Sequence, residues 1–299
     1  MTPESTIKAA PDLPDLFPET RRSRGLATFL RRHTSACIGG VILLAMIFAS
    51  LLAPFLGTQD PMAIAPTMRI RAPSPEFWFG TDMLGRDVYS RVIYGARISL
   101  FVGFAVAVAA TIVGGAFGLI AGYIRWTDGP IMRVMDSLMS IPSILLAIAL
   151  VALTKASVGN VIMAITIAEV PRVARLVRGV VLSLREQPYV EAAIASGTTP
   201  VQVMWRHILP NSLSPVVVQA TYICASAMIV EATLSFIGAG TPPTVPSWGN
   251  VMAEGRAIWQ LKPYIVFIPA AFLSLTVLSV NMIGDGLRDA MDPRLAKGL

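Results

Sequence analysis

Few residues in this sequence have the types and spacing that catalysis requires. The two histidines, His33 and His207, lie too far apart to suggest a pair of metal ligands. The sequence has neither an H-E-x-x-H pattern nor a phosphate-cradling G-x-x-x-x-G-K-[ST] loop. Cys37 and Cys224 fall in apolar segments, where single thiols usually serve packing. These observations argue against an enzyme and predict that the chain itself binds no metal or cofactor.

Four acidic residues interrupt apolar segments, and ionisable residues in such places are often functional. They are Asp136, Glu169, Glu231 and Asp285, and none has an obvious charged partner in the middle of the bilayer. A transporter driven by protons or sodium usually needs an intramembrane ionisable site. The scarcity of such residues favours an energy source outside the chain.

The composition is that of a membrane protein. Hydrophobic residues make up 54% and charged residues 14%, whereas a soluble domain carries about a quarter charged residues. The apolar residues form blocks close to the roughly 20 residues that span a bilayer. We therefore predict an all-α polytopic fold with six spans, at residues 36–56, 98–124, 131–154, 158–177, 213–238 and 263–286. Charges and Pro171 interrupt the fourth span, which is expected to leave the membrane there.

Lys and Arg placement predicts the orientation, because cytoplasmic loops are enriched in both. With six spans, one side receives residues 1–35 (six Lys and Arg), 124–133 (two), 172–206 (five) and 286–299 (three), which is sixteen of the 24. Both termini are therefore expected in the cytoplasm. The net charge of +6 reflects topology and attraction to anionic membrane lipids, and does not indicate nucleic-acid binding.

This topology divides the chain into four parts. Residues 1–35 form a polar cytosolic tail, and 36–97 hold the first span and a long outer loop. Residues 98–290 form the core, and 291–299 a short cytosolic tail. In the core, Gly114, Gly118 and Gly122 share one helix face, which allows another helix to approach closely. Packing within the chain and a subunit interface are equally compatible with this spacing.

A polar stretch at residues 187–211 separates two apolar blocks and has strong local signals. Pro188 suits the first turn of a helix, and Glu191 places negative charge near its N-terminus. Ala192 and Ala193 give this helix little bulk, and Gly197 suits its end. We predict a short helix over 188–196 with a corner at Gly197.

A second short helix is expected directly after that corner. Thr199 and Gln202 make a capping-box pattern around Pro200, and Pro210 is expected to bar continuation beyond Leu209. Such a stiff helix pair on the cytosolic face could dock in a groove of a partner. From these residues alone, an ordinary connector is as compatible as a coupling element.

A resemblance distinguishes these two possibilities. Glu191-Ala192-Ala193, Gly197 and Leu209-Pro210 resemble the EAA loop of bacterial ABC importer permeases. His207 stands where the general pattern has isoleucine, and the RHILPN form resembles the dipeptide and oligopeptide branch. The stretches FGTDMLGRDVYSRVIYGARISL (79–100), EATLSFIGAGTPPTVPSWGNVMAEGR (231–256) and NMIGDGLRDAMDPR (281–294) resemble its C-type subunit.

The resemblance implies an inner-membrane permease of the type I ABC importer fold. It implies as partners a B-type sister permease, two ABC ATPase subunits that use ATP and Mg²⁺, and a periplasmic or lipid-anchored substrate-binding protein. It also implies that Glu191, Ala192, Ala193, Gly197, Pro200, His207, Leu209 and Pro210 couple the permease to an ATPase. Family members mostly carry peptides, and some carry nickel complexes, haem precursors, glutathione or opines.

The outer loops gain an expected role from the resemblance. Thr81 and Asp82 could cap a surface helix beginning at Arg86, with Arg86 and Asp87 facing solvent or the binding protein. Trp248 could anchor the second outer loop at the membrane interface. We predict that Asp82, Arg86, Asp87 and Trp248 contribute to the binding-protein dock, and simple surface packing is the alternative.

Two other functional classes remain open from the sequence. A stand-alone secondary transporter would work without ATP, and a scaffold would recruit ATPases without forming a path. No residue cluster identifies a substrate.

Overall fold

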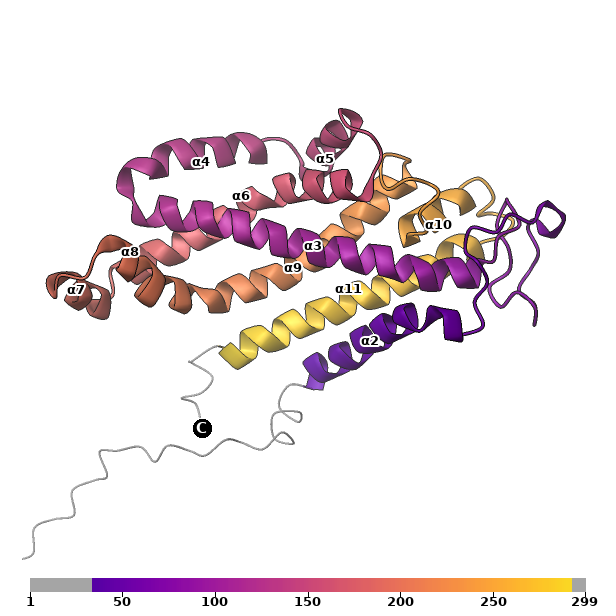
Figure 1. The fold of residues 1–299 in the computed structure, drawn as a ribbon, viewed down its shortest axis with the longest axis horizontal. Helices are drawn as coiled ribbons and strands as arrows, with labels where there is room; N and C mark the ends of the chain where they lie inside the picture. Colours follow the sequence, from indigo (N-terminus) through magenta and orange to yellow (C-terminus); the bar gives the residue numbers. More distant parts are fainter. Residues whose placement is uncertain (1–33, 292–299) are drawn as a thin grey trace, which may run out of the picture.

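Long helices lie side by side along the long axis of the molecule (Figure 1). The computed structural model describes residues 34–291, and within this range the chain is helical, without a strand. The predicted tails fall almost wholly outside these residues. The long helices are α2 (Thr34–Leu51), α3 (Val88–Tyr123), α6 (Val158–Arg185), α9 (Leu209–Phe236) and α11 (Tyr264–Met291).

The glycine face of α3 packs against α6 of the same chain. A Cβ atom added at Gly114 would lie 2.6 Å from the Val173 Cβ, and one at Gly118 would lie 2.5 Å from the Ala174 carbonyl oxygen. Gly122 similarly faces Val181. The small-residue spacing therefore serves close packing between two helices of one subunit, which resolves the choice between packing and a subunit interface.

The predicted third span is broken. It consists of α4 (Arg125–Met139) and α5 (Ser143–Ala152), which meet at an angle of 86°. Pro142 disfavours helical geometry in the residue before it, which explains the break at 140–142. The predicted span at 131–154 is therefore a bent pair of helices and not one straight helix.

Several of the described helices are long and apolar enough to cross a membrane. Four qualify, and the bent α4–α5 pair would make a fifth. The four are Thr34–Leu51, Val88–Tyr123, Pro200–Phe236 and Tyr264–Met291. α6 is not among them, because it carries Glu169 and several arginines, yet it continues as one helix to Arg185. Six spans therefore remain a prediction.

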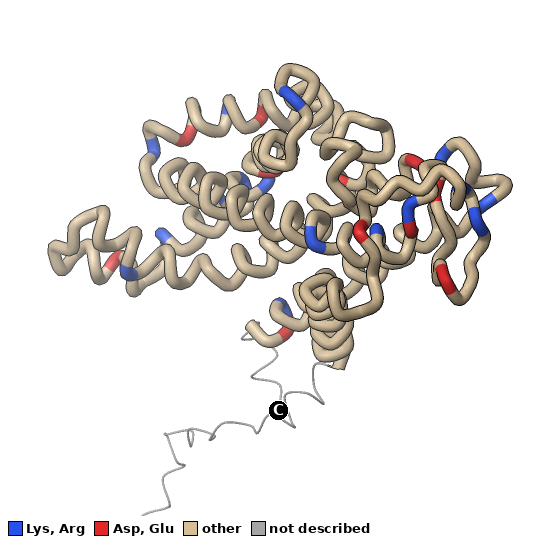
Figure 2. The backbone as a smooth tube through the Cα atoms, turned by 45° about the vertical axis from the view of Figure 1, so that its right-hand side comes forward, with Lys and Arg blue, Asp and Glu red and all other residues tan. Residues whose placement is uncertain are grey.

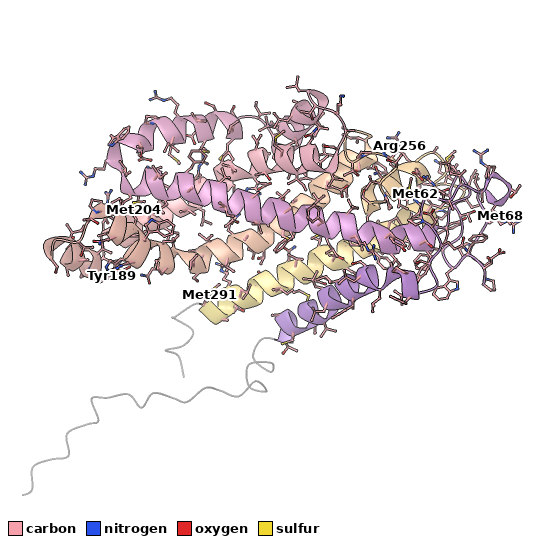
Figure 3. The ribbon with its side chains drawn as sticks, viewed as in Figure 1. Met62, Met68, Tyr189, Met204, Arg256 and Met291 are labelled. Atoms are coloured by element: carbon pink, nitrogen blue, oxygen red, sulfur yellow. The ribbon has the colours of Figure 1, made fainter. Side chains whose placement is uncertain are left out.

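The two ends of the bundle carry different elements. At one end lie α7 (Pro188–Ala195) and α8 (Pro200–Val203), with Tyr189 and Met204 labelled there in Figure 3. The opposite end holds the loop 52–87, which includes η1 (Ala53–Phe55) and η2 (Pro66–Met68), and α10 (Trp248–Gly255). Charged residues gather in this loop and along α4, whereas long stretches of the neighbouring helices carry none (Figure 2).

Candidate functional site

The first helix of the predicted coupling segment is α7. Pro188 lies in its first turn, Ser196 is its C-cap, and Gly197 has φ +82°. The N–H groups of Gly197 and Thr198 donate to the carbonyls of Ile194 and Ala193, which is the Schellman pattern of helix ends. The predicted helix over 188–196 and its corner are confirmed, because these local signals agree with one another.

The second helix begins as predicted but does not end at Pro210. Thr199 and Gln202 form the capping box, and the Thr199 N–H donates to the Gln202 Oε1 at 3.3 Å. The chain then makes a π-helical turn, η3 (Met204–Ile208), and continues into α9 from Leu209. The prediction that Pro210 bars continuation is wrong.

The π-helical turn explains how Pro210 is accommodated. In a regular α-helix its ring would clash with the carbonyl four residues earlier and leave that group unpaired. Here the Leu209 N–H donates to the Met204 carbonyl, five residues earlier, so the helix is already widened before the proline. Pro210 then occupies the first turn of α9, where its missing N–H costs little.

The coupling segment, defined here as residues 187–211, is anchored on one face and open on the other. Val190, Val203 and Ile208 are buried in the main core. The ring centroids of Tyr189 and His207 lie 6.4 Å apart and bridge the two helices. The exposed residues of the coupling segment include Glu191, Ala192, Pro200 and Pro210. Its exposed large apolar side chains are those of Tyr189, Ile194, Val201 and Trp205. An apolar surface on a well-anchored helix pair suits a protein partner.

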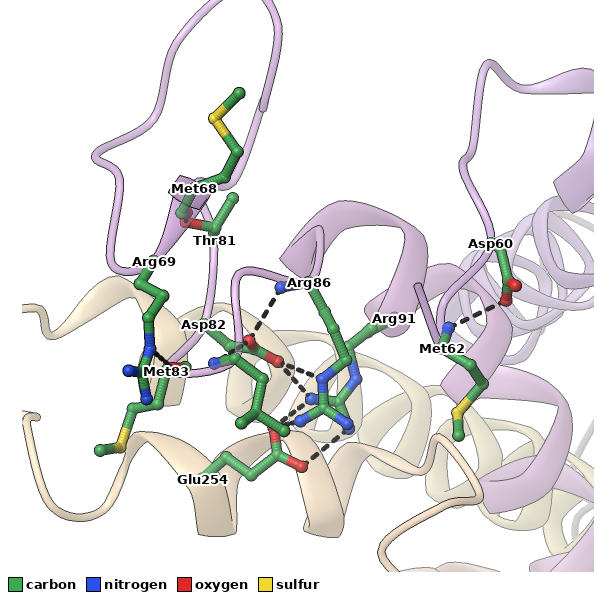
Figure 4. Close-up of polar contacts among 11 residues, drawn as sticks. Asp60, Met62, Met68, Arg69, Thr81, Asp82, Met83, Arg86, Arg91 and Glu254 are labelled. Carbon is green, nitrogen blue, oxygen red and sulfur yellow. Dashed lines mark hydrogen bonds and ion pairs between the residues drawn. The ribbon is translucent and has the colours of Figure 1, made fainter. Parts of the chain in front are cut away.

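The residues predicted for the binding-protein dock are buried at the end of the bundle opposite α7 and α8. Asp82 accepts hydrogen bonds from Arg86 Nε at 2.8 Å and Arg91 Nη1 at 2.7 Å. Glu254 on α10 accepts from both arginines (Figure 4). Asp82 and Arg91 are fully buried, and Arg86 is nearly so. The expectation that Arg86 and Asp87 face solvent is wrong, because Glu254, distant in sequence, completes a buried ion-pair network.

The start of α3 also differs from the expectation. Asp87 is its N-cap and accepts from the Ser90 N–H at 2.8 Å, so the helix begins at Val88 instead of Arg86. The Asp82 side chain instead accepts from the N–H groups of Leu84 and Arg86 and closes a turn. The predicted cap at Thr81 and Asp82, and the separate surface helix, are therefore wrong, because α3 continues unbroken into the second span.

The charge state of Asp82 follows from its neighbours. Burial alone would raise its pKa, but the Arg86 N–H and the guanidinium groups of Arg91 and Arg86 outweigh burial and hold the pKa below its ordinary value. Asp82 is therefore ionised at neutral pH. The network binds the loop 52–87 to α3 and α10.

Trp248 is a buried core residue, and the prediction of an interfacial anchor is wrong. It is fully buried, and its Nε1–H donates to the Val92 carbonyl at 3.0 Å. It packs with Val88, Val92 and Ile265 between α3, α10 and α11. Because Trp248 lies in a turn-rich stretch of the sequence, the short helix α10 that begins there was not predicted.

Substituting Trp248 tests whether its side chain is a buried core residue. We expect Trp248→Phe to lower the free energy of unfolding by about 1–3 kcal/mol, because the hydrogen bond to Val92 is lost and the smaller phenyl ring leaves a cavity in the core. Trp259, which is 50% exposed, provides the control, and Trp259→Phe should change little. Thermal unfolding of the detergent-purified protein measures both. Equal shifts in the two variants would contradict the burial argument.

Comparisons with known proteins identify the family. Residues 114–297 match the family "Binding-protein-dependent transport system inner membrane component", and residues 28–73 match the "N-terminal TM domain of oligopeptide transport permease C". The chain belongs to this permease family. The permease is 53% identical to a probable peptide ABC transporter permease of Sinorhizobium fredii, with 88% of this chain and 90% of the relative covered.

Further relatives carry different substrate names. A dipeptide transport system permease, DppC, of Alkalihalophilus pseudofirmus is 42% identical over 99% of this chain and 96% of its own. A glutathione transport system permease, GsiD, of Pectobacterium atrosepticum is 40% identical, with 89% of each chain covered. The inward-facing MetNI methionine ABC transporter shares the fold, with a TM-score of 0.58, 21% identity, and coverage of 68% of this chain and 96% of that chain.

The four acidic residues that interrupt the apolar segments of the permease all have hydrogen-bond or ion-pair partners. Asp136 pairs with Arg175 at 2.5 Å, Glu169 with Arg172 at 2.9 Å, and Asp285 accepts from the Tyr222 hydroxyl at 2.5 Å. Two of the four, Asp136 and Glu169, therefore have charged partners. For Asp136 the missing signal is the distance of 39 residues between the partners, which only the helix packing brings together.

Glu231 is fully buried in a hydroxyl cluster on the C-terminal half of α9. It accepts from Ser235 Oγ at 2.8 Å and lies 3.4 Å from Ser99 Oγ. Asn250 Nδ2 donates to the Val245 carbonyl at 2.9 Å and so pins the loop beside this cluster. These contacts fix the loop between α9 and α10 of the permease against α3 and α9.

Proposed function

We propose that this chain is the C-type permease subunit of a heteromeric ABC importer that moves small peptides inward. The observation that carries the proposal is the continuous helix Pro200–Phe236, which joins the coupling segment to a membrane span without a break. Movement of α7 and α8 is thereby transmitted directly to α9. Two of the relatives described above are named as a peptide permease and a dipeptide permease, which supports peptides as the substrate class.

The partners follow from this role. Two ABC ATPases would bind ATP and Mg²⁺, one of them against the exposed apolar side of the coupling segment. A B-type sister permease would complete the path, and a periplasmic or lipid-anchored binding protein would deliver the peptide at the outer end. Both termini would lie in the cytoplasm of a bacterial cell, and this chain would bind no cofactor of its own and catalyse no reaction.

The mechanism is mechanical coupling. ATP binding closes the ATPases and displaces α7, and the capped corner at Gly197 prevents the two short helices from fraying under this load. Because η3 and α9 share one backbone helix, the displacement tilts α9 against α3 and α11. The central path then opens to one side of the membrane at a time.

Strain at the corner tests the coupling role. Gly197→Val places a branched side chain at φ +82°, so we expect substrate-stimulated ATPase activity and uptake to fall by about tenfold in the reconstituted importer. Gly238→Val is the matched control, because Gly238 has φ +86° and also has open space around it, but follows the end of α9 that is distant from the coupling segment. Glu191→Lys should act like Gly197→Val.

Unchanged ATPase stimulation and uptake in both Gly197→Val and Glu191→Lys would overturn the coupling assignment. Uptake that continues without ATP and stops with an uncoupler would indicate a secondary transporter instead.

Glutathione is the second candidate substrate, because a 40% identical relative is named for it. ATP-dependent uptake of radiolabelled trialanine and glutathione into the same proteoliposomes distinguishes the two. ATP-dependent uptake of trialanine but not of glutathione is expected. The opposite result would move the chain to the glutathione branch of the family.

A further inference from the structure

An apolar stripe on α2 continues past the end of that helix. Its members are spaced three or four residues apart, as residues on one helix face are, and each is at least half exposed. They are Ile38, Val41, Leu44, Phe48, Leu51 and Phe55. α2 itself ends at Leu51, and Phe55 belongs to η1. The apolar surface of this helix therefore does not stop where the helix stops.

The apolar part of α2 is too short to cross a bilayer alone. Two arginines precede the helix in the sequence, and its apolar block begins at Ala36. From Ala36 to Leu51 the helix covers about 23 Å, whereas the hydrocarbon core is about 30 Å thick. Residues 52–56 follow with three exposed large apolar side chains, and the first charged residue after them is Asp60. The segment 52–56 therefore supplies the missing apolar length.

Trp78, in the returning part of the loop 52–87, lies near the end of this stripe. Its ring centroid is 4.8 Å from that of Tyr89, and the Tyr89 hydroxyl donates to the Leu56 carbonyl at 3.2 Å. The preceding residue, Phe77, is buried, whereas Trp78 is 61% exposed. One side of the indole is thus held against the protein, and the other is open.

The contacts between α2 and α3 give the depth of Trp78. The two helices lie side by side and run in opposite directions (Figure 1). Arg97 Nε donates to the Ser50 carbonyl at 2.6 Å, about 21 Å along α2 from Ala36. Tyr89 precedes Arg97 by about 12 Å along α3 and so lies about 33 Å from Ala36. Because the hydrocarbon core is about 30 Å thick, Tyr89 and the stacked Trp78 lie just beyond its edge.

We propose that Trp78, together with Phe55, anchors the loop 52–87 in the lipid headgroup region of the membrane. An indole suits this region because its ring is apolar and its N–H is polar. Arg97, which lies over the Tyr94 ring at 4.8 Å, can extend its charged end toward the same region. The interfacial anchor expected at Trp248 is thus assigned to Trp78.

Lipid accounts for this surface better than a protein partner does. The exposed stripe on α2, the missing length of that helix and the depth of Trp78 all follow from one bilayer. A sister permease or a binding protein would explain an apolar patch, but not why it ends at the edge of the hydrocarbon core. The proposal is independent of the substrate and does not rest on peptide import.

A fluorescent label tests the position of the loop. Trp78→Cys and Phe55→Cys are each introduced into a chain whose Cys37 and Cys224 are replaced by serine, and the labelled full importer is reconstituted into phosphatidylcholine–phosphatidylglycerol vesicles. Signal from an importer with the cysteine-free chain is subtracted. We expect lipids brominated on their acyl chains to quench most of the emission at both positions, and aqueous iodide to quench little.

Thr67→Cys is the matched control in the same loop. Thr67 is exposed in η2, and its neighbour Met68 lies at the tip of the molecule in Figure 3. Iodide should quench a label there, and brominated lipid should not.

A second measurement needs no label. The emission that Trp78→Phe removes from the unlabelled importer is that of Trp78 itself, and brominated lipid should quench this part of the emission. Quenching of Trp78 by iodide alone would place the loop in water, and quenching by neither agent would mean that a protein covers it. Either result, or equal lipid quenching at Thr67→Cys, would overturn the anchor.

Discussion

Arg91→Leu is expected to destabilise the end of the permease that holds the loop 52–87 by about 3–5 kcal/mol, because removing one member of a buried ion-pair network leaves charges uncompensated. Arg91 is fully buried and contacts both Asp82 and Glu254. Its loss leaves two carboxylates facing a single arginine, Arg86. The loop 52–87 should become sensitive to proteolysis, and the thermal unfolding temperature should fall.

The matched control is Arg69→Leu in the same loop. Arg69 is exposed, and its Nε donates a single hydrogen bond to the Met83 carbonyl at 2.6 Å. We expect a loss of about 1 kcal/mol or less. If limited proteolysis and thermal unfolding gave the same result for both variants, the network would not be what holds the loop.

Gly118→Ala is expected to lower the free energy of unfolding by about 1–3 kcal/mol through overpacking. The added Cβ would lie 2.5 Å from the Ala174 carbonyl oxygen and 2.7 Å from the Val177 Cβ, and a helix backbone cannot yield locally. α3 and α6 would have to separate along their length. Thermal unfolding and the yield of folded protein in detergent measure the effect.

Gly115→Ala is the control on the same helix, because no atom lies within 4 Å of its added Cβ. Alanine has the higher helix propensity, so this variant should be neutral or slightly stabilising. A similar loss in both variants would mean that glycine acts through backbone flexibility and not through the close approach of α6.

Features that depend on neighbouring residues could be predicted from the sequence. The helix over 188–195, its end at Gly197 and the Thr199–Gln202 capping box each rest on a few adjacent positions, and all three are present. The glycine face could be predicted for the same reason, although the spacing did not reveal its partner helix. Whether the segment docks onto an ATPase remains a prediction.

Features that depend on distant partners could not be predicted. Asp82 and Arg86 have the composition of a solvated loop, and only Glu254, 168 residues beyond Arg86, makes them a buried network. Trp248 likewise needed Val92 and Ile265 to become a core residue. The continuation past Pro210 depends on a change of backbone hydrogen bonding that side-chain types do not specify.

The π-helical turn at Met204–Ile208 makes room for one residue without redirecting the helix that contains it. A π-helical turn holds one residue more than the turns around it, and its greater width absorbs that residue. The segments on either side of the turn therefore keep the faces that they would have in a regular helix. Deleting one residue there would restore the ordinary pitch and bring the ring of Pro210 against the carbonyl of the preceding turn. The spare residue in this one turn is thus what lets a single rigid rod run from the coupling segment of the permease through a proline to Phe236.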